Sequence, residues 1–178
     1  RQQLTALAKA GLDAIRVSDP AAGVPSTVPV LTLTLDQARA LTLAHADAAD
    51  ASGFKIDQKI VISSDGDVVI DAAGALIHAA SAREIGYFHD VGIKSINING
   101  DNVVAISVEQ YRALHGVVFT SGSKVTLSDT ADHLKALTPA EIAALRTNGV
   151  DFIDSSDATL SLTVAQAAKL PADVKFTS

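Results

Sequence analysis

Residues 125–178 read VTLSDTADHLKALTPAEIAALRTNGVDFIDSSDATLSLTVAQAAKLPADVKFTS, and residues 68–121 are a looser copy of the same pattern. Several residues recur 57 positions apart: Glu84 and Glu141, Gly92 and Gly149, Ile96 and Ile153, Phe119 and Phe176. Between the glycines and the phenylalanines the offset slips by one, so that Gln110 corresponds to Gln166. Recurrence at a fixed period predicts that the chain is built from similar stacked units.

A third, more degenerate copy precedes these two. One group of residues lies 81 positions before its counterparts, with Leu4, Leu7, Gly11, Ile15 and Val17 before Ile85, Phe88, Gly92, Ile96 and Ile98. A second group lies 73 positions before, with Leu35, Gln37 and Leu41 before Val108, Gln110 and Leu114. The difference of eight predicts an inserted surface loop at residues 19–28, which are rich in Pro and Gly. We therefore divide one continuous array into units 1–67, 68–124 and 125–178.

Each unit also repeats within itself. Phe119, Leu127, Thr130 and Leu137 match Phe152, Leu160, Thr163 and Leu170, each 33 positions later. This spacing predicts two coils per unit, each made of a short strand, a turn, a second short strand and a helix. One coil of each pair has an extra helix, at residues 82–91 and 138–148. The expected fold is thus an α/β, solenoid-like repeat array with about 57 residues per two-coil unit.

Local signals place the element ends. Helix N-caps are expected at Asp36, Ser81, Ser107, Thr138 and Thr163, because short polar side chains accept hydrogen bonds from free backbone amides. Gly92 and Gly149 are expected to end helices. Residues 54–57, 60–63 and 159–162 are predicted to be strands. Four equivalent side chains should face a shared core: Ile96, Ile153, Phe119 and Phe176.

Composition excludes several classes of function. The net charge of −6 argues against nucleic-acid binding and against an anionic membrane surface. No apolar run approaches the roughly 18 residues of a membrane span, so membrane insertion is not expected. The chain has no Cys, which excludes disulfides and thiolate chemistry. Because Arg1 opens directly into a helix-like pattern, we expect the chain to be a fragment of something longer.

No catalytic constellation is visible. The five His residues are scattered, and the motifs of nucleophilic, phosphate-binding and zinc-dependent enzymes are missing. The metal-site candidates are acidic residues in predicted strand-to-strand turns: Asp65, Asp67, Asp101, Asp154 and Asp157. Calcium needs about six to eight converging oxygens, and each turn supplies about two or three. Asx-turn chemistry explains these residues without an ion, so no cofactor or metal is expected and calcium is kept as an alternative.

The run from residue 125 to residue 170 resembles alanine-rich repeats found in tandem in very large Gram-negative bacterial proteins. Such proteins are secreted or surface-exposed, often exported by type I systems, and often also carry haemolysin-type calcium-binding repeats. The resemblance implies a secreted or cell-surface location and a non-enzymatic structural or adhesive role. It also implies neighbouring repeats of the same polypeptide as partners. The alternative is a ligand-binding module that holds a glycan or calcium at the acidic turns.

Overall fold

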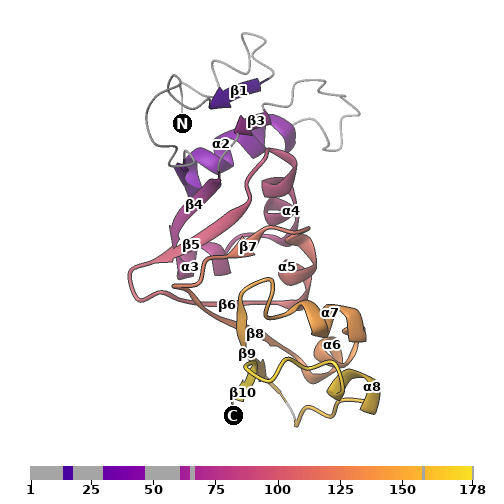
Figure 1. The fold of residues 1–178 in the computed structure, drawn as a ribbon. Coiled ribbons are helices and arrows are strands. Elements are labelled where there is room, and N and C mark those ends of the chain that lie inside the picture. Colours follow the sequence, from indigo (N-terminus) through magenta and orange to yellow (C-terminus); the bar gives the residue numbers. More distant parts are fainter. Residues whose placement is uncertain (1–13, 18–29, 47–60, 65–66, 158, 178) are drawn as a thin grey trace, which may run out of the picture.

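The computed structural model shows an α/β chain and describes residues 14–17, 30–46, 61–64, 67–157 and 159–177 (Figure 1). These ranges contain ten strands and seven helices. The strands are β1 (Ala14–Val17), β2 (Leu31–Thr34), β3 (Val61–Ser64), β4 (Val68–Ala73), β5 (Ser95–Asn99), β6 (Val103–Ile106), β7 (Val118–Phe119), β8 (Lys124–Asp129), β9 (Val150–Ser155) and β10 (Lys175–Thr177). The helices are α2 (Leu35–Ala46), α3 (Gly74–His78), α4 (Ala82–Asp90), α5 (Val108–Ala113), α6 (Ala131–Lys135), α7 (Pro139–Ala144) and α8 (Val164–Ala167).

The described strands form three parallel sheets. Their orders are β1-β3, β2-β4-β5-β7 and β10-β9-β8-β6. The chain passes from the second sheet to the third through the short turns between β5 and β6 and between β7 and β8. Figure 1 shows the result as an elongated molecule, with β1 at one end and β10 at the other. Most helices lie along one side of the strands, as connections between parallel strands require.

The strand registers follow the sequence offsets. Ile70 pairs with Ile96, and 57 positions later Leu127 pairs with Ile153. Ile96 in turn pairs with Phe119, as Ile153 pairs with Phe176. The β1–β3 pair has the same relation, because Ile15 opposite Ile62 corresponds to Ile96 opposite Phe119 at offsets of 81 and 57. Strands that correspond to each other in the sequence repeat therefore pair with strands that also correspond to each other.

Three of the four side chains predicted to face the core do so. Ile96, Ile153 and Phe119 are buried in one continuous hydrophobic cluster. The prediction for Phe176 is wrong, since this side chain is 52% exposed against 4% for Phe119. The physical reason is local: Asn148 and Gly149 lie on Phe119, whereas within the described chain β10 is an edge strand beside β9 alone.

The two predicted helix-ending glycines have the same geometry. Gly92 has φ 91° and Gly149 has φ 85°, in the left-handed region that favours glycine. After α4, the Ile93 amide donates to the Phe88 carbonyl at 3.0 Å, and after α7 the Val150 amide donates to the Leu145 carbonyl at 2.9 Å. These are six-residue closures of the Schellman type, which satisfy carbonyls left free at a helix end.

Most predicted caps are confirmed, and one is wrong. The side chains of Ser81, Ser107, Thr138 and Thr163 each accept from the backbone amide three residues on. Asp36 is not a cap, because α2 begins at Leu35 and the Thr34 hydroxyl accepts from the Gln37 amide at 3.3 Å. Asp36 lies in the first helical turn instead.

The strand predicted at residues 159–162 is also wrong, because these residues belong to no ladder. Its counterpart in the preceding copy, β6, pairs with β8. The predicted strand at 60–63 is observed one residue later, as β3. The inserted loop at 19–28 and the predicted strand at 54–57 lie outside the described residues.

No helix in the described ranges combines the length and the apolar character that crossing a bilayer requires.

The glycine at position 149 provides a test of how closely the coils stack. A Cβ built on Gly149 would lie 2.7 Å from the Phe119 carbonyl oxygen, whereas one on Gly100, also at positive φ, would meet nothing within 4 Å. We expect Gly100→Ala to cost roughly 1 kcal/mol of unfolding free energy and Gly149→Ala about 2 to 5 kcal/mol. Denaturant titrations measure both. Equal costs would contradict the close stacking.

Candidate functional site

Two buried glutamines each connect their own helix to the end of an earlier helix, α5 to α3 through Gln110 and α8 to α6 through Gln166. Gln110 and Gln166 are 6% and 4% exposed, and each closes a capping box at the start of its own helix. The Nε2 group of each glutamine donates hydrogen bonds to residues earlier in the chain. Gln110 Nε2 donates to the carbonyl oxygen of His78, the last residue of α3, at 3.0 Å. It also donates to the carbonyl oxygen of Ala80, two residues later, at 2.6 Å.

Gln166 repeats this contact one unit later. Its Nε2 donates to the Lys135 oxygen at 2.9 Å and to the Leu137 oxygen at 2.7 Å. Lys135 and Leu137 lie 57 positions after His78 and Ala80. Because the last carbonyls of a helix have no partner within the helix, each glutamine satisfies acceptors that would otherwise be buried and unpaired.

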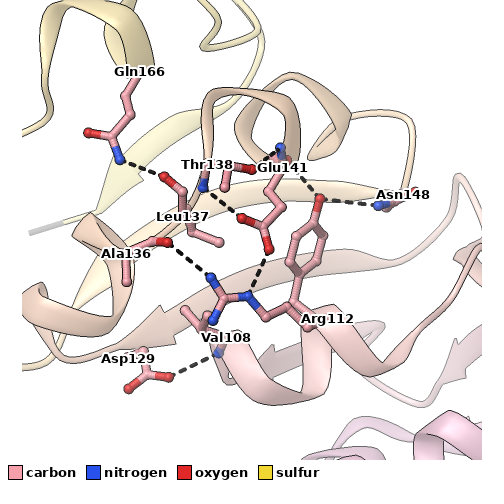
Figure 2. Close-up of polar contacts among 10 residues, drawn as sticks. Val108, Arg112, Asp129, Ala136, Leu137, Thr138, Glu141, Asn148 and Gln166 are labelled. Carbon is pink, nitrogen blue, oxygen red and sulfur yellow. Dashed lines mark hydrogen bonds and ion pairs between the residues drawn. The ribbon is translucent and has the colours of Figure 1, made fainter.

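An arginine–glutamate pair joins the helices of adjacent coils (Figure 2). Arg112 Nε donates to Glu141 Oε1 at 2.7 Å, and Arg112 Nη2 donates to the Ala136 carbonyl at 3.0 Å. The other Glu141 oxygen accepts from the Thr138 amide at 2.6 Å, which completes the capping box of α7. Arg112 holds the pKa of Glu141 down, from its usual value to about 2.

The same ion pair occurs in the preceding copy. Arg39 Nε donates to Glu84 Oε1 at 2.5 Å, and these residues lie 73 and 57 positions before Arg112 and Glu141. Both ion pairs join two helices, α2 to α4 through Arg39–Glu84 and α5 to α7 through Arg112–Glu141. These two arginines and two glutamates are therefore paired with each other.

A hollow of about 360 Å³ lies beside the second pair, between α5 and the segment of α7. The Tyr111 hydroxyl borders it, donates to the Glu141 carbonyl at 2.8 Å and accepts from Asn148 Nδ2 at 3.1 Å. Burial raises the pKa of Tyr111 above its usual value. A phenol in this state is a poor general base, and it serves to connect α5 with the turn before β9.

A ladder of polar side chains crosses the neighbouring strands β4, β5 and β7. Asp71 accepts from Asn97 Nδ2 at 2.6 Å and from Asn99 Nδ2 at 2.8 Å, and the Thr120 hydroxyl donates to Asn97 Oδ1 at 2.9 Å. The hydrogen bonds from Asn99 and Asn97 lower the pKa of Asp71. This ladder holds the carboxylate in its ionised form with its donors already in place.

Two of the predicted metal-site residues, Asp67 and Asp101, are not gathered into a metal site among the described residues. Asp65 lies outside the described residues. Asp67 is exposed just before β4. Asp101 Oδ1 accepts from the Val103 amide two residues on, at 3.2 Å, which is the Asx-turn geometry.

The remaining two, Asp154 and Asp157, are bound by their own chain. The Asp154 carboxylate accepts from the hydroxyls of Ser128 at 3.2 Å and Thr177 at 3.1 Å. Asp157 Oδ1 accepts from the Ala131 amide at 2.8 Å. Across the part of the chain that the structure describes, no three His, Cys, Asp or Glu residues gather as a metal site would require.

Residues near the C-terminal end of the described chain border a hollow of about 430 Å³. Apolar side chains of Ile153, Leu160 and Phe176 line it together with the polar residues Asp157 and Thr177. Sequence reasoning missed the roles of Gln110, Gln166 and the arginine–glutamate pairs. One signal was available, because a glutamine three residues after a Ser or Thr cap recurs in each copy.

No protein-family model, curated protein or solved structure matches this chain. The geometry defines an α/β chain with parallel sheets, in which Gln110, Gln166 and the Arg–Glu pairs bind the chain's own helices.

The Arg112–Glu141 pair predicts a pH-dependent stability. A carboxylate with a depressed folded-state pKa adds stability that is complete above its unfolded pKa and is lost as pH falls toward 2. Because Arg112 is 44% exposed and solvent screens the pair, we expect Glu141→Gln to cost about 1 to 2 kcal/mol at pH 7. Denaturation at several pH values should show this cost shrinking below about pH 4.

The exposed Glu109, in α5, provides a matched control for that series. Glu109→Gln should change stability by only a few tenths of a kcal/mol. A cost for Glu141→Gln that stays constant down to pH 2 would contradict the assignment of its pKa to the ion pair.

Proposed function

We propose that this chain is a non-enzymatic structural or adhesive segment of a large bacterial secreted or cell-surface protein. In this proposal it is a solenoid-like array with about 57 residues per two-coil unit. The observation that carries it is the recurrence of coil-to-coil contacts at the repeat offsets. Gln110 and Gln166 bind equivalent helix ends, and Arg39 and Arg112 bind equivalent glutamates.

The physical argument is that of quasi-one-dimensional proteins. In an array, each coil contacts only its neighbours, and stability is the sum of coil and interface contributions. A polar contact that every coil makes with the previous one is what such an architecture needs. A catalytic protein instead concentrates perturbed polar groups at one cleft. Here the group with the largest pKa shift, Glu141, is engaged with Arg112 and the Thr138 amide.

The extended form supports a role in spacing or attachment. The described elements follow one another from β1 to β10 along the length of the molecule (Figure 1). The net charge of −6 keeps such a surface soluble. A segment of this kind can be lengthened by adding units without a change in its cross-section.

Glycan or calcium binding at the acidic turns remains a prediction that no contact in the described residues favours. It has a direct test, because an ion bound only by the folded state raises the melting temperature. We expect the same melting temperature in millimolar calcium and in chelator. A rise that Asp154→Asn together with Asp157→Asn abolishes would replace the proposal with the ligand-binding alternative.

Location is the test of the proposal itself. Antibodies raised against the purified chain should label intact cells of the source organism, or detect the protein in the culture medium. A cytosolic enzyme from the same cells, probed in parallel, controls for lysis. Signal that appears only after the cells are broken would contradict a secreted or surface role.

A further inference from the structure

The chain has four asparagines, and glycine follows two of them. An asparagine side chain can be attacked by the backbone nitrogen of the next residue, and glycine favours this reaction because it has no side chain to block the approach. The other two asparagines are followed by Ile or Val, whose branched side chains crowd that nitrogen. The reactive candidates are therefore Asn99–Gly100 and Asn148–Gly149.

The second pair is held on both of its residues. The Gly149 amide donates to the Arg146 carbonyl at 3.0 Å, and a Cβ on Gly149 would lie 2.7 Å from the Phe119 carbonyl oxygen. The Asn148 carbonyl accepts from the Phe119 amide at 3.1 Å, and Asn148 Nδ2 donates to the Tyr111 hydroxyl at 3.1 Å. This asparagine can react only after the segment that follows α7 separates from β7.

The first pair lies at an open turn. Asn99 is the last residue of β5, and Gly100 is exposed in the turn to β6, which projects from one side of the molecule (Figure 1). A Cβ on Gly100 would meet nothing within 4 Å. Among the described residues, the Gly100 amide has no backbone acceptor. The nitrogen next to Asn99 is therefore free to lose its proton to solvent and to move.

The Asn99 side chain belongs to the polar ladder across β4 and β5. Asn99 Nδ2 donates to Asp71 Oδ2 at 2.8 Å, and Asn97 Nδ2 donates to Asp71 Oδ1 at 2.6 Å. These hydrogen bonds lower the pKa of Asp71, so that its carboxylate is ionised at neutral pH. A carboxylate in place of the Asn99 amide would turn the hydrogen bond to Asp71 into a contact between two negative charges.

We propose that Asn99 is a site of spontaneous covalent modification in the folded protein, where its side-chain amide becomes a carboxylate. The Gly100 nitrogen loses its proton to hydroxide and forms a bond to Asn99 Cγ. The bond between Cγ and Nδ2 breaks, and Nδ2 takes a proton from water and leaves as ammonia. Water then opens the cyclic imide at either carbonyl, which leaves aspartate or isoaspartate at this position. The reaction needs no enzyme, oxidant or reductant, and it depends on neither the repeat array nor a surface location.

Peptide mapping by mass spectrometry tests the site. The purified chain is incubated in mildly alkaline buffer, folded in one arm and in denaturant in the other. Trypsin then separates the two sites into peptides 95–112 and 147–169. In denaturant both asparagines should convert at similar rates. In the folded chain Asn99 should convert at least about tenfold faster than Asn148, because a local opening free energy of about 1.4 kcal/mol slows a protected site by that factor.

A sample digested at time zero corrects for conversion during digestion, and fragment spectra place the change within each peptide. Equal rates at the two sites in the folded chain would overturn the proposal. So would a folded chain in which Asn99 stays unmodified while the denatured chain converts. A change located at Asn97 or Asn102 instead of Asn99 would contradict it as well.

The variant Asn99→Asp tests what the modification does to the polar ladder. Asn99→Ser is the matched control, because it removes the same hydrogen bond without adding a charge. At neutral pH we expect the melting temperature of Asn99→Asp to lie below that of Asn99→Ser.

The double variant Asp71→Asn with Asn99→Asp exchanges the two partners and restores one amide and one carboxylate. It should recover part of the melting temperature that Asn99→Asp loses. An Asn99→Asp variant as stable as Asn99→Ser, or a double variant that recovers nothing, would contradict the charge contact with Asp71.

Discussion

The structure depends on one constraint: the carbonyls at the C-terminal ends of α3 and α6 lie against later helices, where they need donors. A buried carbonyl without a partner costs about 1 to 3 kcal/mol. Gln110 and Gln166 supply the donors from the next coil, while their Oε1 atoms accept from the capping residues Ser107 and Thr163. Each glutamine thus caps the start of its own helix and the end of an earlier one, α3 for Gln110 and α6 for Gln166, so that these helix ends depend on a later segment of the chain.

The same dependence explains the character of the C-terminal end. Phe119 is covered by the Asn148–Gly149 segment, whereas Phe176 is half exposed on β10, an edge strand of the described sheet. Residues 159–162 have the composition of a strand and no ladder partner. The exposure of Phe176 thus follows from its position on an edge strand of the described sheet.

The sequence correctly predicted features of the fold that depend on local chemistry and on residues that recur. Ser107 and Thr163 as caps, Gly149 as a helix end and Ile153 in the core each follow from a residue and its copy. The prediction from sequence failed where the burial of a side chain depends on a neighbouring segment, as it does for Phe176. The glutamine contacts were missed because a repeated glutamine does not reveal that its amide reaches a different helix. Asp101, Asp154 and Asp157 do not form a metal site, and their carboxylates accept hydrogen bonds from amides and hydroxyls of the chain itself.

Amide hydrogen exchange in the Gln110→Leu and Gln166→Leu variants tests the central claim most directly, because it reports stability coil by coil. Gln110→Leu should speed exchange in α3 and α5 by about tenfold or more, as loss of roughly 1.4 kcal/mol requires. Gln166→Leu should do so in α6 and α8. Each variant should leave the other pair of helices nearly unchanged. Faster exchange confined to the mutated helix, or spread evenly over all helices, would contradict coupling between neighbouring coils.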